Sequence, residues 1–287
     1  MASCAIDTAI RNAIAVGGKL SHLAILDNFC WCSSYDKTRL AELVDAAAAC
    51  YDFSVGFGTP LISGKDSMFN DFKGYDLPTG QAGEKPREVK ISIPPTLVIS
   101  SIGVMDDINK SVTPEFKMPG DAIYLLGETH DEMGGGEYFK MLGELGNNVP
   151  KVDLEKNIKI YEALEKAIQK EFLASSISLT SGGLAIALAR ASIGGMLGAN
   201  ISLNNLLGTF TNIDSALFSE SQGRILVTVA KKNIPAFEKL VKSIPFSKLG
   251  TVSKEKTFTI KSGAQKIVNT KVETLAKSYH AFSNKNK

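Results

Sequence analysis

Apolar residues recur at intervals of three and four in several stretches of the chain, which is the spacing of one helix face. In the first stretch Ile6, Ile10 and Ile14 share a face, and Gly17-Gly18 follows as a helix end. The same spacing predicts helices over residues 40–51, 154–168, 183–190 and 234–244, with Asp153 as the N-cap of the second. The pattern therefore predicts several amphipathic helices packed on a common core.

Short apolar runs between these helices predict strands over residues 23–26, 60–62, 96–104, 122–126, 174–179, 225–229, 248–252 and 258–260. The first run is expected to end at Asp27 in a polar turn. Residues 72–88 are polar and rich in glycine and proline, which predicts a long loop. The segment after Ser278 is polar and predicts a loose tail.

Strands and helices alternate throughout, which predicts a mixed α/β class (α+β). A polar segment at residues 106–110 suggests two domains, 1–113 and 114–287. Hydrophobic residues make up 44% and charged residues 22% of the 287 positions, and the net charge of +2 gives no reason to expect nucleic acid or an anionic membrane as a partner. Without an apolar run of about 18 residues or a signal-peptide pattern, a cytoplasmic protein is expected.

The cysteines, the histidines and one glycine-containing stretch are the first candidates for catalysis or ligand binding. The four cysteines show no metal-type spacing and are interpreted as reduced, packed thiols, and His22, His130 and His280 are isolated and interpreted as ordinary histidines. In residues 58–67 a short strand precedes a glycine, a lysine, an aspartate and a hydroxyl. That stretch is either a turn that offers backbone N–H groups and an ammonium to phosphate, with the aspartate free for Mg²⁺, or a tight surface turn.

Three further stretches have similar alternatives. Residues 181–184 open a helix after a strand, which makes an anion site or a close packing contact. The glycine run at 132–137 fits a phosphate or turns the chain, and the polar residues 219–222, before Arg224, indicate a ligand edge. Composition and spacing alone thus reach only a cytosolic α/β protein with several candidate anion sites.

Taken in order, six stretches resemble the second half of phosphoribosylformylglycinamidine synthases: residues 5–12, 26–31, 58–68, 132–138, 179–185 and 218–224. The resemblance implies the aminoimidazole-ribotide-synthetase-like fold. Each half of such an enzyme has an A domain, whose strands complete a barrel shared with the other half, and an outer α/β B domain. Here residues 1–113 would be an A domain whose N-terminal strands are missing, and residues 114–287 the B domain.

The resemblance also implies the reaction. Formylglycinamide ribonucleotide, ATP and glutamine-derived ammonia give formylglycinamidine ribonucleotide, ADP and phosphate in purine synthesis, with ATP and Mg²⁺ as cofactors. The implied partners are the first half of the synthase, in the same or a separate chain, or a homodimer mate, together with a glutaminase subunit. The main catalytic residues belong to the first half, so none is assigned here, and this chain alone is expected to be inactive.

By position in the family's motifs, Asp27 and Gly64 would contact ATP and Ser67 the substrate. Lys65 stands where many family members have an asparagine Mg²⁺ ligand. Because an ammonium cannot ligate a metal, Lys65 would contact the ATP phosphates instead, or Asp66 would supply the metal-binding oxygen.

Long forms of the enzyme hold a second, trapped nucleotide with Mg²⁺. Asn12 matches one metal ligand of that site, but Thr8 stands where a glutamate belongs and Ser178 where an aspartate belongs. Losing two carboxylates removes most of the negative charge that a Mg²⁺ site needs. The second site is therefore expected to be degenerate.

Two alternatives to a catalytic half remain open. One is a non-catalytic structural half that completes the barrel and docks partner subunits. The other is a sibling enzyme such as aminoimidazole ribotide synthetase, selenophosphate synthetase or thiamine-monophosphate kinase, which the residues around Asp27 and Lys65 disfavour.

The degenerate second site predicts that the protein purifies without stoichiometric ADP, because no carboxylate cluster remains to retain a Mg²⁺-nucleotide. Denaturing the purified protein and quantifying released nucleotide by chromatography checks this. About one ADP per chain would contradict the prediction.

Overall fold

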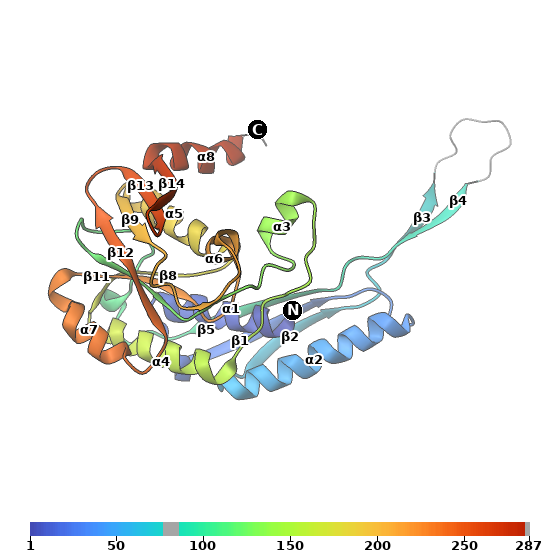
Figure 1. The fold of residues 1–287 in the computed structure, drawn as a ribbon. Helices are drawn as coiled ribbons and strands as arrows, with labels where there is room; N and C mark the ends of the chain where they lie inside the picture. Colours follow the sequence, from blue (N-terminus) through green and yellow to red (C-terminus); the bar gives the residue numbers. More distant parts are fainter. Residues whose placement is uncertain (77–85, 285–287) are drawn as a thin grey trace.

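A computed structural model describes residues 1–76 and 86–284 of the chain. Its helices are α1 (Ala2–Ala15), α2 (Lys37–Phe57), α3 (Glu137–Leu142), α4 (Leu154–Gln169), α5 (Gly183–Gly195), α6 (Ile213–Phe218), α7 (Ile234–Val241) and α8 (Val272–Asn284), with short 3-10 helices at Leu20–His22, Ile108–Lys110 and Lys231–Asn233. Figure 1 shows their arrangement. None of the helices in the described ranges is long and apolar enough to span a membrane.

The strands are β1 (Leu23–Cys30), β2 (Leu61–Ser67), β3 (Phe72–Asp76), β4 (Arg87–Ile91), β5 (Thr96–Gly103), β6 (Ala122–Leu126), β7 (Thr129–His130), β8 (Leu173–Ser178), β9 (Gly198–Ser202), β10 (Gly208–Thr209), β11 (Ile225–Val229), β12 (Phe246–Ser253), β13 (Thr257–Ser262) and β14 (Gln265–Lys271). The predicted mixed α/β class is confirmed. The division near residue 113 stays a prediction.

A three-stranded sheet in the order β2-β1-β5 forms the first layer. β1 pairs in parallel with β2 and antiparallel with β5. A parallel pair needs a long crossover, and α2 provides it between β1 and β2. The sheet therefore brings residues near 27 and 64, which are distant in sequence, side by side.

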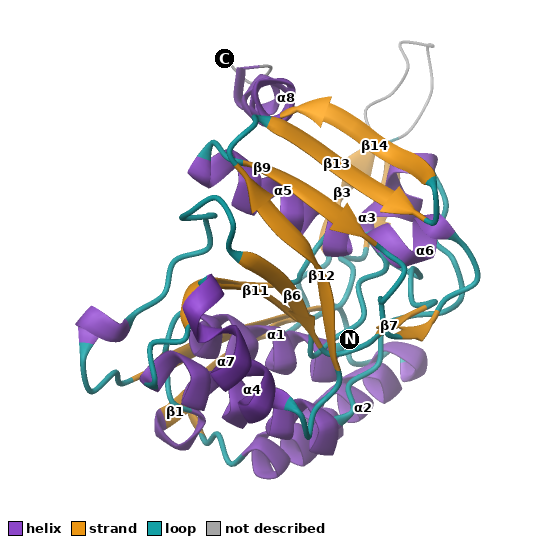
Figure 2. Cartoon of the chain, turned by 60° about the vertical axis from the view of Figure 1, so that its left-hand side comes forward, coloured by secondary structure: helices purple, strands orange, loops and turns teal. Residues whose placement is uncertain are grey.

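A seven-stranded sheet in the order β14-β13-β9-β12-β6-β11-β8 forms the second layer. Every residue of β6 and β11 is buried, because helices cover both faces. Residues of α4 and α7 belong to one core cluster and residues of α5 and α6 to the other, and Figure 2 shows α4 and α7 together in front of the sheet. Strands that are buried on both faces have continuous apolar sequences, and this is why the sequence predicts β6 and β11 well.

Helix α1 packs between the two sheets. Ile6, Ile10 and Ile14 are fully buried and join residues of β1, α4 and β11 in one core cluster. Burying an isoleucine side chain contributes about 1.5–3 kcal/mol. This apolar stripe therefore contributes to holding the two sheets together.

The described residues leave one face of the three-stranded sheet exposed. On β5, Leu97 faces the helices and is 7% exposed, whereas Val98 and Ile102 are 52% and 57% exposed. Successive side chains of a strand point to opposite faces, so Val98 and Ile102 lie on the outer face. We call this surface the outer face; it includes Asn28, the cross-strand partner of Val98.

Two predictions about residues 27 and 64–67 are wrong in local structure. Asp27 lies inside β1, which continues to Cys30, and residues 64–67 belong to β2 rather than to a turn. The cause is strand pairing: β1 is hydrogen-bonded on both sides and carries its register with β2 through to Cys30 and Ser67. Polar residues thus adopt strand geometry because a central neighbour satisfies their backbone groups.

The predicted loop and tail are also corrected. Phe72–Asp76 and Arg87–Ile91 pair as the hairpin β3–β4, which projects from the rest of the chain in Figure 1; residues 77–85 lie outside the described residues. Helix α8 covers Val272–Asn284 where a loose tail was expected after Ser278. Pairing of β13 with β14 leads directly into this helix. Strands β9 and β14 and the short helices α3 and α6 were not predicted.

Asp36 caps the 21-residue helix α2, since its carboxylate accepts hydrogen bonds from the backbone N–H groups of Thr38 and Arg39. We expect Asp36→Ala to lower the free energy of unfolding by about 1 kcal/mol. Urea denaturation measures this. Asp45→Ala, at an exposed position of the same helix, is the control and should change stability by less than about 0.5 kcal/mol; equal effects would contradict the capping role.

Candidate functional site

Asp27 and Gly64 are register partners on the adjacent parallel strands β1 and β2. A Cβ atom added to Gly64 would overlap the Oδ1 atom of Asp27. The glycine therefore leaves the space in which the Asp27 carboxylate lies over β2. Two of the residues predicted to contact ATP are thus brought together, and the structure gives a steric reason for a glycine at position 64.

The electrostatic setting of Asp27 disfavours its charged form. Burial raises the pKa of the Asp27 carboxyl, and the negative charge of Asp66 raises it further. Burial also raises the pKa of the Cys50 thiol on α2, with the Asp27 charge adding to the effect. Asp27 is therefore a half-buried carboxylate with a raised pKa on the helix side of the sheet, which makes it a candidate functional group.

Lys65 and Ser67 lie on the opposite face of β2 from Asp27, because strand side chains alternate. There the Lys65 ammonium donates to the Ser67 hydroxyl, and Lys65 is the register partner of Asn28 on the outer face. The predicted residues thus form two groups: Asp27, Gly64 and Asp66 on one face, and Lys65 and Ser67 on the other. Because β2 is an edge strand, a ligand beside it can reach both.

The Asp27–Asp66 pair has the right oxygen chemistry for Mg²⁺. That ion is usually held by one or two carboxylates together with substrate phosphates and water. No group of three or more metal-binding side chains is found in the described ranges. The carboxylates on β1 and β2 are thus chemically suited to Mg²⁺ only together with further oxygen ligands from elsewhere. Asn12, the other metal ligand expected from the sequence, lies on α1 and not at this β1–β2 site.

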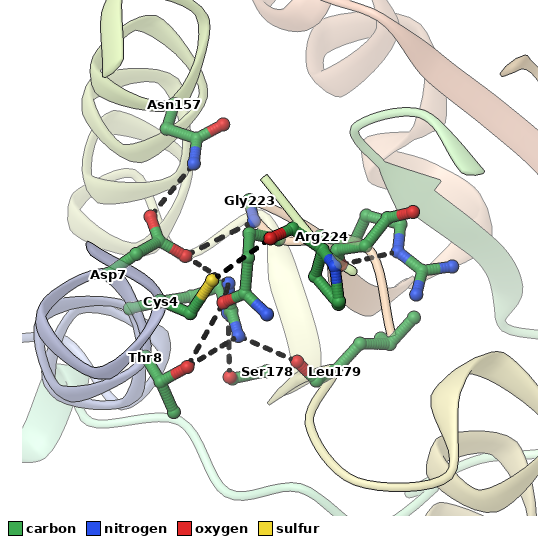
Figure 3. A network of polar contacts seen from close by, with 12 residues as sticks. Cys4, Asp7, Thr8, Asn157, Ser178, Leu179, Gly223 and Arg224 are labelled. Carbon is green, nitrogen blue, oxygen red and sulfur yellow. Dashed lines mark hydrogen bonds and ion pairs between the residues drawn. The ribbon is translucent and has the colours of Figure 1, made fainter. Parts of the chain in front are cut away.

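A buried ionic network surrounds α1, and Figure 3 shows part of it. Asp7 and Arg11 are both fully buried and form an ion pair one helical turn apart. The Asp7 carboxylate also accepts hydrogen bonds from Asn157 Nδ2 at 2.8 Å, from the Tyr161 hydroxyl and from the Gly223 N–H at 3.3 Å. The network therefore joins α1 to α4 and to the loop before β11.

Thr8 and Ser178, which stand where the family resemblance places carboxylates, lie in the hydrogen-bond network of Arg11. Its Nε donates to the Ser178 hydroxyl at 3.0 Å and its Nη2 to the Leu179 carbonyl at 2.8 Å. The Thr8 hydroxyl donates to Gln222 Oε1 at 3.1 Å. A guanidinium and two hydroxyls do not fit Mg²⁺, which prefers anionic oxygens. Among the described residues, those that line a hollow together with Asn12 include no carboxylate.

Glu220 brings three predicted anion-site stretches together. Its Oε1 accepts hydrogen bonds from the Gly182 N–H and the Glu137 N–H, each at 2.9 Å. Gly182 is the N-cap of α5, and Glu137 is the first residue of α3, directly after a glycine-rich turn. The protein's own carboxylate thus lies where the sequence suggested an external phosphate, and the residues 219–222 serve as its support.

Arg224 completes this support. It is fully buried, and its guanidinium donates to the Ser219 and Ser221 carbonyls at 2.5 and 2.9 Å and to the Thr129 hydroxyl at 3.0 Å. Burial, with the nearby Arg11 charge, lowers the pKa of Arg224 to about 9. Hydrogen bonds to carbonyls shape the loop, so Arg224 has a structural role.

The other residues weighed from the sequence have ordinary surroundings. The four cysteines are free thiols. His22 and His130 form hydrogen bonds to neighbouring hydroxyls, Ser21 and Thr209, both at 2.9 Å. Sequence reasoning missed the roles of Asp7, Arg11 and Glu220. A signal for the first two existed, since an Asp and an Arg four apart flank the Ile6-Ile10-Ile14 stripe. Glu220 lies in the stretch 219–222 that was interpreted as a ligand edge, but its contacts with two distant turns could not be predicted from that stretch.

Comparison with known proteins adds the family context. Residues 118–262 match the family described as AIR synthase related protein, C-terminal domain. The chain is 31% identical over 283 residues to phosphoribosylformylglycinamidine synthase subunit PurL of Caldanaerobacter subterraneus. This alignment covers 96% of the chain but 35% of the relative, so the chain spans about a third of that protein's length.

Solved structures share the fold. Thermotoga maritima PurL complexed with FGAR superposes with a TM-score of 0.72 at 17% identity, covering 96% of this chain and 42% of that one. The same protein complexed with ATP gives a TM-score of 0.68 at 17% identity, covering 96% and 41%. A HypE–HypF complex chain gives 0.68 at 16% identity, covering 94% and 84%.

The raised pKa of Asp27 predicts a pH-dependent effect of Asp27→Asn. The folded protein binds the Asp27 proton more tightly than the unfolded chain, so this carboxylate destabilises the fold once pH exceeds its folded pKa. We expect Asp27→Asn to raise the free energy of unfolding at neutral pH, and the gain to vanish below about pH 4, where both states are protonated. Urea denaturation across pH, with exposed Asp45→Asn as control, tests it; a destabilised variant at pH 7 would contradict it.

Proposed function

Because the chain belongs to the AIR synthase related family, we propose that it is the second-half portion of a phosphoribosylformylglycinamidine synthase. That enzyme would convert formylglycinamide ribonucleotide, ATP and glutamine-derived ammonia to formylglycinamidine ribonucleotide, ADP and phosphate in the cytoplasm. The proposal is supported by the similarity of almost the whole chain to PurL. The structural observation that carries it is Gly64 making room for the Asp27 carboxylate.

In this proposal the residues of β1 and β2 hold the nucleotide. Asp27 lies in the space above Gly64 and accepts hydrogen bonds from ATP, and Asp66 on the same face provides the oxygen for Mg²⁺. The metal, when bound, neutralises charge on the transferring phosphoryl group. Lys65 on the other face contributes its ammonium to a phosphate, and Ser67, its hydrogen-bond partner, contacts the substrate.

The catalytic groups would come from the first half of the synthase. The outer face supports this part of the proposal, since Val98 and Ile102 are more than half exposed on it and β2 has an unpaired edge in the described sheet. A companion first half, in the same or a separate chain, or a homodimer mate, would cover this face and place the reacting groups beside β2. A glutaminase subunit would supply ammonia, and this chain alone would be inactive.

A second candidate is a structural half that completes the barrel and docks partner subunits without binding ATP. The position of β2 at the edge of the described sheet favours it, because its outer backbone groups can pair with another strand, and every residue from Leu61 to Asp66 is exposed. The raised pKa of Asp27 favours the catalytic reading instead, since a purely structural strand has no need of an unfavourable carboxylate.

Asp27→Ala separates the two functions. In the enzyme reconstituted from this chain and its first-half partner, we expect the variant to weaken ATP binding by about tenfold or more, because a charge-assisted contact is lost. Titration calorimetry measures the affinity, and the amidine-forming rate is followed in parallel. Asp52→Ala, an exposed change on α2, should leave both unchanged.

Unaltered ATP affinity in a correctly assembled Asp27→Ala enzyme would favour the structural half. Amidine formation by the isolated chain with ammonia and ATP would contradict the need for a companion. Sedimentation of the chain with and without that companion checks assembly independently of activity.

A further inference from the structure

The β3–β4 hairpin, which we call the arm, has one exposed apolar face. Residues that pair across a hairpin share a face, and Phe72 pairs with Ile91 and Gly74 with Val89. The Phe72 ring lies over Gly74, because a Cβ atom added to that glycine would be 2.7 Å from the ring. Phe72 and Ile91 are nevertheless 59% and 58% exposed. A two-stranded hairpin alone is only marginally stable in water, so the arm needs packing that the described residues do not provide.

The other face of the arm is polar. Lys73 pairs with Lys90 and Tyr75 with Glu88, and Lys90 forms an ion pair with Asp71 at 3.0 Å. These side chains suit contact with water. The arm is therefore amphipathic, and Tyr75, which is 72% exposed, is an aromatic residue on the face opposite Phe72.

An apolar hollow of about 460 Å³, which we call the base pocket, lies between α1, α2 and the segment before β5. Its apolar lining comes from Met1, Ala2, Trp31, Ala46, Ala49 and Pro95. The Trp31 N–H donates to the Ser67 carbonyl at 2.8 Å, and the Trp31 carbonyl accepts from the Asn70 N–H at 3.0 Å. Residues 67–70 lead into β3, so the pocket adjoins the base of the arm. The arm itself extends away from the rest of its own chain (Figure 1).

The charges of the two surfaces are complementary. Arg87 and its register partner Asp76 lie at the far end of the apolar face of the arm. Three charged residues line the base pocket, and two of them, Arg39 and Glu42, pair with each other at 2.9 Å. The third, Asp45, is exposed. Neither Arg87 nor Asp45 forms an ion pair with a described residue. An apolar face that ends in a cation therefore fits an apolar pocket with an anionic rim.

We propose that the arm of one molecule packs over the base pocket of a second copy, with Phe72 and Ile91 on the apolar lining and Arg87 beside Asp45. Each molecule carries both surfaces, so two copies make the contact twice about a two-fold axis, the commonest symmetry of homo-oligomers. Exchange of arms covers apolar surface that each molecule alone leaves exposed. The contact is distinct from the outer face and is independent of the proposed synthase activity.

Sedimentation of the full-length chain over a range of concentrations tests the contact. We expect a monomer–dimer equilibrium, and we expect Phe72→Ser and Ile91→Ser each to raise the dimer dissociation constant about tenfold or more, because a buried apolar side chain is lost at both contacts. Tyr75→Ser, the matched change on the polar face, should leave the constant unchanged. Since neither Phe72 nor Ile91 belongs to a core cluster of the described residues, the melting temperature at high dilution should be the same for all three variants.

Charge reversal identifies the surfaces that meet. Arg87→Glu should weaken the dimer several-fold, and Asp45→Arg in the same chain should restore it, because the pair is re-formed with opposite signs. A chain that stays monomeric at high concentration would overturn the proposal. So would a dimer that Phe72→Ser and Tyr75→Ser weaken equally, or one that Asp45→Arg fails to restore. A dimer weakened by Val98→Lys but not by Phe72→Ser would lie on the outer face and would also exclude the exchange of arms. ATP binding and amidine formation play no part in these measurements, so the proposed function is tested separately.

Discussion

The buried ion pair between Asp7 and Arg11 is the interaction on which the arrangement of both sheets depends. It lies on α1, which packs between them, and its hydrogen bonds reach α4, β8 and the loop before β11. Two buried charges are tolerated only when their remaining hydrogen-bonding capacity is used, and removing one partner of such a pair typically costs about 3–5 kcal/mol. The network therefore specifies one orientation of α1, which the apolar stripe alone would not.

The same chemistry explains why several apparent anion sites are not vacant. Glu220 supplies a negative charge to two glycine-rich turns at once, and Arg224 holds its loop through main-chain carbonyls. Glycine-rich turns before helices attract anions because their N–H groups are unpaired. A fold can satisfy them from within, so such a motif identifies an anion-binding geometry without identifying the anion.

Much of the fold was predictable from the sequence because the central strands and long helices carry strong periodicity. β6, β11 and α4 matched closely, and Asp153 caps α4 as expected. Strands rich in polar residues were missed, since the strand character of Asp27–Cys30 and Gly64–Ser67 comes from pairing with distant segments. The family resemblance predicted only that Asp27 and Gly64 both contact ATP. Their pairing on adjacent strands, and the separation of their face from that of Lys65, depend on the strand register. The converging contacts of Glu220 depend on loop positions in three dimensions.

The outer face has a consequence for biogenesis. Val98 and Ile102 present apolar surface on a sheet whose edge strand β2 is also unpaired, and such surfaces recruit other chains indiscriminately while they wait for the correct one. If the proposed first half covers this face, in the same polypeptide or another, folding here is coupled to its timely arrival. Molecules of this chain made in excess of the segment that covers the outer face would be the first to aggregate or to be degraded. The abundance of the chain in a cell would therefore follow the supply of that segment.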